Sequence, residues 1–439
     1  MDQAVGQAAT WQVVTAVVLF LLTYGMIVTE KINRTVLALA GAVMMVILGI
    51  VDLDAAIGRH IEWKTIFLLI GMMMLVGITN KTGVFQYAAV KAAQLAKGDP
   101  GRIFVLLCAL TATASAFLDN VTTVLLVVPV TFSITRILKV NPLPYLIGEI
   151  ISSNAGGTAT LIGDPPNIMI GSANPELTFN DFLIHLAPVV IVIMIVTVWI
   201  MKRVYAPSFR VSAEHKAELM KLSAETFIKD RKLMNKALVV LGLTIAGFLL
   251  HSALHMEPAV VALSGASLLM LIGVKEEQID EVFYSVEWMT IFFFVGLFVL
   301  VGGLVDVGAI QFLAGRMLEL TAGDMTFTSM LILWVSGIAS ATIDNIPFVA
   351  TMIPLIQDLG VQMEITDAQQ LEPLWWSLAL GACLGGNGTL IGASANVIVA
   401  GLAMKEGKGL SYMEYLKLGA PLTLLALVIS TIYVYFIIL

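Results

Sequence analysis

Long apolar stretches, separated by short polar segments, dominate this chain. Most of them are close to the length of about 20 residues with which a helix crosses a hydrocarbon core. The candidate spans are Trp11–Val28, Thr35–Val51, Trp63–Ile78, Leu146–Gly171, Phe182–Val204, Ala237–Leu254, Ala259–Val274, Trp288–Leu304, Leu374–Gly401 and Leu416–Leu439. We therefore predict an all-α polytopic membrane protein.

Two further apolar regions, 103–138 and 325–358, are each interrupted by an Asp-Asn pair and followed by proline. We interpret each as a re-entrant hairpin whose polar tip lies at mid-membrane, because about 15 apolar residues before the tip are slightly short for a span. The alternative is two ordinary spans joined by a tight turn outside the bilayer.

Two of the spans are broken by glycine, proline and asparagine where a membrane helix should continue. These broken helices cover 144–171 and 374–401. Glycine allows a close approach of the backbone, and proline ends a helix. Irregular backbone at membrane depth is tolerated only inside protein or beside a wet cavity. The breaks and the hairpin tips therefore mark a candidate transport site.

The second half of the chain repeats the first. Asp119-Asn120 recurs as Asp344-Asn345 after 225 residues, and the pair Glu62-Trp63 recurs as Glu287-Trp288 at the same offset. We expect repeat 1 at 1–205, a cytoplasmic linker at 206–236 and repeat 2 at 237–439. The expected elements of repeat 1 are scaffold helices at 11–97, the hairpin 103–138, the broken helix 144–171 and a helix at 182–204. Those of repeat 2 are scaffold helices at 237–320, the hairpin 325–358, the broken helix 374–401 and a helix at 416–439.

The positive charges set the expected orientation. The segment 202–236 contains nine basic and four acidic residues, which indicates a cytoplasmic loop. With five crossings in each half, 21 of the 24 basic residues fall on that side. An odd number of crossings inverts the second repeat relative to the first and places both termini outside. Discontinuous helices in inverted repeats are typical of secondary transporters with a site at the midplane.

Composition agrees with this class. The chain is 59% hydrophobic and 13% charged, whereas soluble domains have about 25% charged residues. Its mean hydropathy is +0.94. We expect no nucleic-acid partner, no metal centre and no organic cofactor, although Na+ or H+ could bind as a coupling ion. Cys108 and Cys383 lie in apolar context and are expected to pack as small side chains.

Carboxylates at membrane depth are candidates for function, because each costs about 2.5–3.5 kcal/mol on insertion scales. Asp119, Asp164 and Asp344 could bind a proton or Na+. Asp119 and Asp344 could instead cap the helices that follow them. Asp164 has no acidic counterpart, since Ala393 occupies the equivalent place. Glu149 could relay protons. We predict that these four residues couple transport to protons.

Amides, hydroxyls and glycines complete the expected site. They could coordinate an ion or substrate, or could satisfy the backbone at the breaks. The full candidate set for binding is Asp119, Asn120, Thr122, Asn154, Gly156, Gly157, Thr158, Asp164, Asn167, Asp344, Asn345, Gly386, Asn387, Thr389 and Asn396. The broken segments contain no lysine or arginine. This absence favours a cation, a neutral solute, or an anion that binds together with a cation.

Four motifs, FLDNVTTVLLVVPVT, GGTATLIGDPPN, IDNIPF and LGGNGTLIGASAN, make the chain resemble the ArsB/NhaD permease family, especially its P-protein-like bacterial members. The resemblance implies the ion-transporter superfamily, with scaffold and transport domains, an elevator mechanism and a homodimer. Related sodium–dicarboxylate carriers have Ser-Asn-Thr at the hairpin tips. Aspartates there argue against dicarboxylate or citrate uptake unless cations intervene.

The function that these features favour is secondary transport in the cell membrane, not enzymatic catalysis. Proton-coupled efflux of arsenite or antimonite is the first hypothesis, with an ATPase subunit as an optional partner, as in arsenical pumps. Sodium/proton antiport is the second hypothesis. Transport of chloride or of a di- or tricarboxylate is the third. An intramembrane aspartyl protease is a remote alternative, because a protease dyad requires no inverted duplication.

Overall fold

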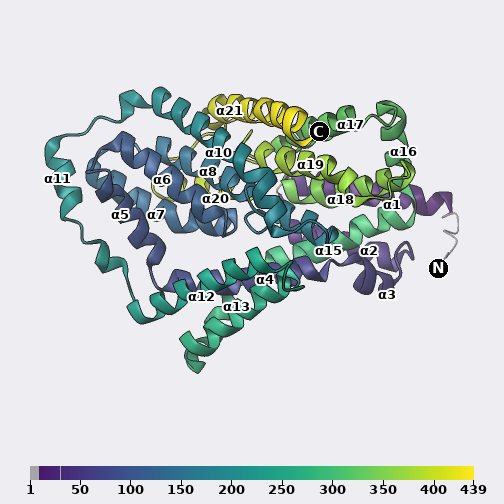
Figure 1. The fold of residues 1–439 in the computed structure, drawn as a ribbon, viewed down its shortest axis with the longest axis horizontal. Helices are drawn as coiled ribbons and strands as arrows, with labels where there is room; N and C mark the ends of the chain where they lie inside the picture. Colours follow the sequence, from purple (N-terminus) through teal and green to yellow (C-terminus); the bar gives the residue numbers. More distant parts are fainter. Residues whose placement is uncertain (1–8, 30) are drawn as a thin grey trace.

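The computed structural model describes residues 9–29 and 31–439, and the regular structure of this part is helical (Figure 1). The helices of the first half are α1 (Thr10–Val28), α2 (Arg34–Ile47), α3 (Leu53–Ala55), α4 (Trp63–Lys81), α5 (Val84–Leu95), α6 (Pro100–Ser115), α7 (Asn120–Leu138), α8 (Leu143–Thr158), α9 (Pro165–Ala173) and α10 (Phe179–Val204). Those that follow are α11 (Ala213–Lys221), α12 (Arg231–Leu250), α13 (Pro258–Gly273), α14 (Ile279–Tyr284), α15 (Trp288–Asp306), α16 (Ala309–Thr321), α17 (Met325–Thr342), α18 (Asn345–Gln362), α19 (Glu372–Gly385), α20 (Ser394–Lys405) and α21 (Tyr412–Tyr433).

Within the described residues, 8 helices are long and apolar enough to cross a membrane. They are α1, α4, α7, α10, α12, α15, α17 and α21 with the π-helical turn that follows it. Two expected spans, Thr35–Val51 and Ala259–Val274, are shorter helices: α2 has 14 residues and α13 has 16. Each packs along a long helix from the other half of the chain, α2 on α15 and α13 on α4.

Three of the helices beside the two Asp-Asn pairs are longer than the short hairpin arms that the sequence predicts. α7, α17 and α18 have 19, 18 and 18 residues. α7 and α18 exceed the apolar run because they continue through polar residues, Arg136 in one and Asp358 in the other. Arm length therefore does not distinguish a re-entrant hairpin from two spans. The position of the tips carries that argument instead.

Local backbone geometry recurs at the offset found in the sequence. Gly83 and Gly308 precede α5 and α16 with φ of 81° and 78°, a left-handed conformation that favours glycine. Asp119 and Asp344 both cap the next helix by accepting a hydrogen bond from its first-turn N–H groups. The repeated sequence thus folds into repeated turns and caps.

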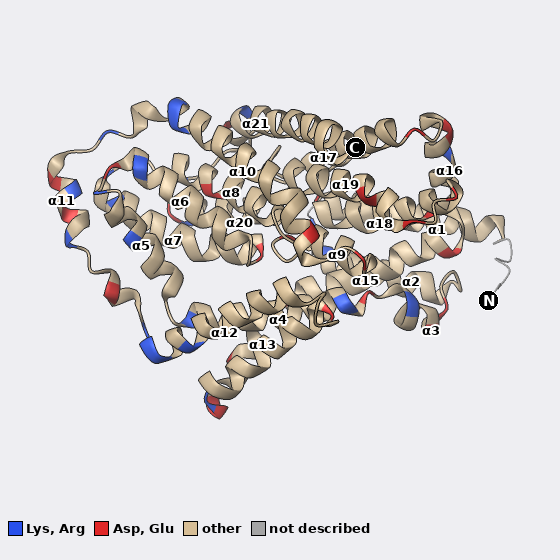
Figure 2. Cartoon of the chain, viewed as in Figure 1, with Lys and Arg blue, Asp and Glu red and all other residues tan. Residues whose placement is uncertain are grey.

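Helices of the first half of the chain pack against helices of the second half. α4 lies on α13 and α2 on α15, while α7 contacts α20 and α9 contacts α18. In Figure 1, α4, α12 and α13 lie together along one edge, and the segment around α11 runs along one end from α10 to α12. Figure 2 shows charged residues mainly at helix ends and along this connecting segment.

Candidate functional site

The tips of both Asp-Asn turns border one small cavity of about 50 Å³. Five of the predicted site residues line it, namely Asp119, Asn120, Asn154, Asp164 and Asn345. Because these residues come from both halves of the chain, the fold brings together groups that are more than 200 residues apart. A cavity of this size holds an ion or a few water molecules.

The first tip is fixed by its own hydrogen bonds. Asp119 accepts from the N–H of Thr122 at 2.8 Å, so Thr122 takes part through its backbone. The Asn120 carboxamide oxygen accepts from the Ser115 hydroxyl at 2.6 Å. The Ser153 hydroxyl donates to the Asn120 carbonyl at 3.1 Å and joins the tip to α8. Asp119 therefore acts as a helix cap and a wall of the cavity at once.

The second tip carries an ion pair that sequence reasoning missed. Arg34, the first residue of α2, donates through Nη1 to Asp344 at 2.6 Å and to the Ser394 hydroxyl at 2.8 Å. Ser394 also donates to Asp344 at 2.9 Å. The guanidinium lies 4.9 Å from the centre of the Phe293 ring. A fixed positive charge thus stands at the tip, although the broken segments contain none.

Arg34 also separates two spaces. It lines the small cavity together with Asp119 and Asp164, and it lines a neighbouring cavity of about 330 Å³ together with Asp344. Ser394 and Ala393 border both. The larger space lies beside the α1–α2 turn and has room for a small organic ion. Arg34 therefore faces the ion-sized space and the solute-sized space from one position.

Three asparagines connect the two broken helices. The Asn154 amide nitrogen donates to the carboxamide oxygens of Asn387 at 2.8 Å and Asn396 at 2.9 Å. The Asn154 oxygen, by contrast, has no hydrogen-bond partner in the described chain and is buried at the cavity wall. An unpaired buried acceptor costs about 1–3 kcal/mol. This oxygen is therefore available to a bound cation or to a donor group of a solute.

Other predicted site residues satisfy the backbone where the helices break. Asn167 donates to the carbonyls of Thr158 and Thr160, and Asn396 donates to those of Gly386 and Thr389. The Thr158 hydroxyl donates to the Asn154 carbonyl at 2.8 Å, and the Thr389 hydroxyl donates to the Ala341 carbonyl at 2.5 Å. None of Asn167, Thr158 and Thr389 lines the small cavity of the described chain. Their partners indicate a supporting role.

The glycines at the breaks allow backbone to meet backbone. A Cβ on Gly156 would lie 2.2 Å from the Ala112 carbonyl oxygen of α6, and one on Gly157 would lie 2.3 Å from the Asn120 carboxamide oxygen. In the second half, a Cβ on Gly386 would lie 3.1 Å from the Gly392 carbonyl oxygen. The two glycines of the first break thus bring α8 directly against α6 and the first tip.

Gly156→Ala is expected to destabilise the protein, because its Cβ would overlap main-chain atoms that cannot rotate away. Overpacking typically costs about 1–3 kcal/mol. The matched control is Gly242→Ala, whose Cβ would meet nothing within 4 Å and which replaces glycine inside helix α12. We expect the midpoint of thermal unfolding in detergent to fall for the first variant and to stay or rise for the second. Equal midpoints would contradict the close approach.

The carboxylates differ in their surroundings. Asp164 precedes α9, lines the small cavity, is 2% exposed, and its Oδ2 has no hydrogen-bond partner in the described chain. Glu287, which sequence reasoning noted only as part of a repeated pair, directly precedes α15 without a side-chain capping hydrogen bond, and it also lines the cavity. The Thr290 hydroxyl donates to it at 3.0 Å. Asp119, Asp164 and Glu287 therefore face the same space, with Arg34 as the cation beside them.

Glu149 lies apart from this cavity, in the contact between α7 and α8. It is fully buried and accepts a hydrogen bond from the Thr131 hydroxyl, while its Oε2 has no partner within the described residues. The position equivalent to Glu149 at the offset of the broken helices, 229 residues, is Leu378. The predicted proton-coupling set is therefore divided between the tips and a separate site in the first half.

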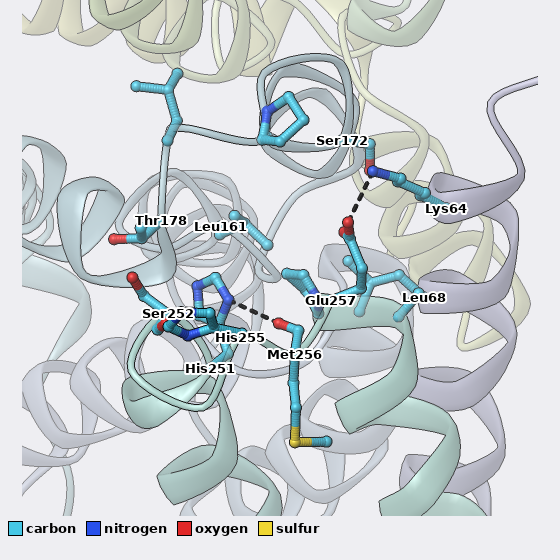
Figure 3. Close-up of a pocket in the computed structure, with 15 residues that line it drawn as sticks. Lys64, Leu68, Leu161, Ser172, Thr178, His251, Ser252, His255, Met256 and Glu257 are labelled. Atoms are coloured by element: carbon cyan, nitrogen blue, oxygen red, sulfur yellow. Dashed lines mark hydrogen bonds and ion pairs between the residues drawn. The ribbon is translucent and has the colours of Figure 1, made fainter. Parts of the chain in front are cut away.

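Another cavity lies between α4, the α12–α13 turn and the α9–α10 turn, with a volume of about 270 Å³ (Figure 3). Its charged groups pair with each other, since Lys64 contacts Glu257 at 2.9 Å. The Phe179 N–H donates to the His251 Nε2 at 3.1 Å, and the His251 Nδ1 lies 3.1 Å from the Met256 carbonyl oxygen. The polar groups of this cavity thus hold the turns together.

Comparison with known proteins agrees with a transporter. The sequence pattern of the citrate transporter (CitMHS) family matches residues 24–381. The chain belongs to this family. It is 44% identical over 425 residues to an uncharacterized transporter of Mycobacterium bovis, which covers 96% of this chain and 98% of that protein. The chain is a transporter, and an enzymatic role such as an aspartyl protease is set aside.

The likeness to the P protein is confirmed. The chain is 35% identical to the mouse P protein over 511 aligned positions, covering 98% of this chain and 61% of that protein. Among solved structures, the YdaH transporter of Alcanivorax borkumensis matches with a TM-score of 0.58 at 11% identity, over 96% of this chain and 97% of the other. This match shows the fold alone. The family whose pattern matches is that of the citrate transporters, whereas the motifs predicted the ArsB/NhaD permeases.

Proposed function

We propose that this protein is a secondary transporter of a small anion, most simply a carboxylate, which binds together with protons or another cation. The family match supports the anion, and Arg34 is the single structural observation that carries the proposal. It is a cation with five N–H donors, two of which are used by Asp344 and Ser394 in the described structure. Its guanidinium faces a cavity large enough for a small organic anion.

The structure supports arsenite efflux less well than the sequence does. It depends on a site without a fixed positive charge, and Arg34 supplies that charge at 2.6 Å from Asp344. The family match points to citrate transporters instead. The ATPase partner, which belongs to arsenical pumps, loses its basis together with arsenite. Asp344 repels an anion less than sequence reasoning expects, because Arg34 already neutralises it.

The excess of carboxylates supports a co-bound cation. Asp119, Asp164 and Glu287 line the small cavity, and the cation beside them, Arg34, is already paired with Asp344. Uncompensated buried charges of one sign are costly, so an anion requires a proton or a metal cation beside it. The small cavity is the proposed cation site and the larger one is the proposed anion site. Sodium/proton exchange is the second candidate function, favoured by the same three carboxylates.

We further propose two inverted repeats, divided as the sequence indicates at 1–205 and 237–439 with the linker 206–236. Three observations support this division. The caps and turns recur, helices of each half pack on helices of the other half, and both tips lie at one cavity. Two tips that meet inside the protein favour re-entrant hairpins, because turns between ordinary spans would lie at the membrane surface. The same proposal includes an elevator movement, a homodimer in the cell membrane, a cytoplasmic linker and external termini.

The proposal divides the predicted site residues by role. Asn120, Asn154 and Asn345 are assigned to solute or ion binding with Arg34. Asp119, Asp164, Asp344 and Glu287 are assigned to charge balance at the tips, and Glu149 to proton binding away from them. The remaining residues are assigned to support of the breaks, namely Thr122, Gly156, Gly157, Thr158, Asn167, Gly386, Asn387, Thr389 and Asn396.

The purified protein in proteoliposomes with an internal pH dye tests this function. The liposomes are challenged separately with citrate, succinate, chloride, Na+ and arsenite. We expect a carboxylate to drive proton movement and to accumulate under a proton gradient, whereas protein-free liposomes show neither. Proton movement with Na+ and no response to any anion would replace the proposal with sodium/proton exchange. A response to arsenite alone would restore the first hypothesis.

A further inference from the structure

A long apolar groove runs along the outside of the molecule between α6 and α10. Its volume is about 560 Å³, and its lining is almost entirely apolar. Small residues of α6, among them Ala109, form one wall, and Ile191 and Ile195 of α10 form the other. These two isoleucines are 57% and 65% exposed. Nothing in the described chain fills the space between the two walls.

One end of the groove is cationic. Lys202 lines it, and the Lys202 Cε lies 3.5 Å from the place that a Cβ would take on Gly101 at the start of α6. The Asp99 carboxylate lies 3.6 Å from the same place, but it caps α6 at the Arg102 N–H and pairs with Lys216 at 3.8 Å. Arg102 follows directly, and Arg203 stacks on Trp199 with the guanidinium 5.2 Å from the ring. Among the ion pairs of residues 9–29 and 31–439, none involves Lys202, Arg102 or Arg203.

The other end of the groove reaches the first broken helix. Gly156, Ala159 and Thr160 line it there. The Thr160 hydroxyl donates to the Ala116 carbonyl just before the first tip, and Ala116 also lines the groove. Whatever fills the groove therefore touches both the arm and the break that shape the transport site.

We propose that this groove binds an anionic phospholipid, with an acyl chain between α6 and α10 and the phosphate on Lys202 and Arg102. An unfilled apolar groove beside unpaired cations matches a lipid, because basic sites between membrane helices bind acidic head groups. Trp199 at the same level agrees with an interfacial position. A second copy of the chain fits less well, because its apolar face would leave the cations unpaired. The bound lipid holds α6 against α10 and so steadies the first tip.

Native mass spectrometry of the delipidated full-length protein tests the proposal. Phosphatidylglycerol and phosphatidylcholine with identical acyl chains are added separately, and the bound fraction is measured. We expect phosphatidylglycerol to bind more tightly. Removing a cation near a membrane surface weakens attraction about fivefold, so Lys202→Gln with Arg102→Gln should weaken phosphatidylglycerol binding by about 25-fold. Lys408 and Lys417 are exposed and do not line the groove, so the charge-matched control, Lys408→Gln with Lys417→Gln, should leave it unchanged.

A second variant tests the apolar part without changing charge. Ala109→Trp fills the groove and should reduce binding of both lipids. Equal binding of the two lipids by wild type, or unchanged binding by the Lys202/Arg102 variant, would overturn the proposal. So would a disulfide between copies of an Ile195→Cys variant, because both native cysteines are buried and such a bond would show that a second chain covers the groove.

Discussion

Replacing Arg34 with alanine is expected to abolish anion transport at ordinary solute concentrations. The change removes the hydrogen bonds to Asp344 at 2.6 Å and to Ser394 at 2.8 Å. It also leaves the carboxylates around the tips without their cation. The Arg34–Asp344 pair is half-buried, with 30% and 15% of the two side chains exposed. A hydrogen bond to a charged group, such as the one that the guanidinium would donate to the anion, is worth about 1.5–3 kcal/mol, which corresponds to a rise in apparent KM of about 10- to 150-fold. Uptake into proteoliposomes over a range of carboxylate concentrations measures this effect.

Two further variants separate the roles of this residue. Arg34→Lys keeps the charge but loses the planar fork that binds carboxylates in two-point contact, so an intermediate KM is expected. The double variant Arg34→Ala with Asp344→Asn removes both charges. If Arg34 served only to neutralise Asp344, the double variant would recover transport. If it binds the anion, the double variant stays as defective as the single one.

The matched control for Arg34 is Arg59. It also pairs with an aspartate, Asp306, at 2.7 Å, but its side chain is 66% exposed. Exposed ion pairs contribute little, so Arg59→Ala should leave the KM nearly unchanged. A normal KM for Arg34→Ala, with folding verified by gel filtration, would contradict the assignment of Arg34 as the anion ligand.

Local signals made much of this architecture predictable. The Asp-Asn pairs are visible because a carboxylate in an apolar run is costly, and the structure uses Asp119 and Asp344 as helix caps at the cavity. The break before α9 is visible because Pro165 and Pro166 can start a helix but not continue one. Each signal lies within a few residues of the feature that it produces.

The residues that sequence reasoning missed act over long separations. Arg34 and Asp344 are 310 residues apart, and Arg34 stands at the start of an ordinary helix with no break beside it. The sequence contains a weak indication of Glu287, because this residue occupies the position in the second repeat that Glu62 occupies in the first. Its place beside Asp119 depends on how the two halves of the chain pack together. Only the packing of α2 and α15 against each other brings Arg34 and Glu287 to the tips.

Residue type also cannot separate a ligand from a structural partner. Asn154 and Asn167 have the same side chain, and both lie at the first break. The Asn167 amide nitrogen donates hydrogen bonds to two carbonyls of that break. The Asn154 oxygen, by contrast, has no hydrogen-bond partner among the described residues and lies at the cavity wall. Which backbone groups a break leaves open depends on the turn geometry, and that geometry is not encoded in a short motif.

Glu149→Gln is expected to uncouple transport from the proton gradient while leaving the fold intact. Glu149 is fully buried, and the Thr131 hydroxyl is the hydrogen-bond partner of one of its oxygens. A buried unpaired carboxylate charge costs several kcal/mol, and a bound proton removes this cost. Glutamine has the same shape, accepts the same hydrogen bond from Thr131, and is permanently neutral. It therefore imitates the protonated state and cannot release a proton.

The measurement is carboxylate uptake by proteoliposomes with and without an imposed pH difference. A difference of one pH unit supplies about 1.4 kcal/mol, or tenfold accumulation, for each coupled proton. Wild type should respond to it, and Glu149→Gln should transport the solute down its own gradient with a smaller response. The exposed linker residue Glu218 provides the control, since Glu218→Gln should behave as wild type. An unchanged response of Glu149→Gln would leave proton binding to Asp119, Asp164 and Glu287 at the tips, and Glu149 would then be only a packing partner of Thr131.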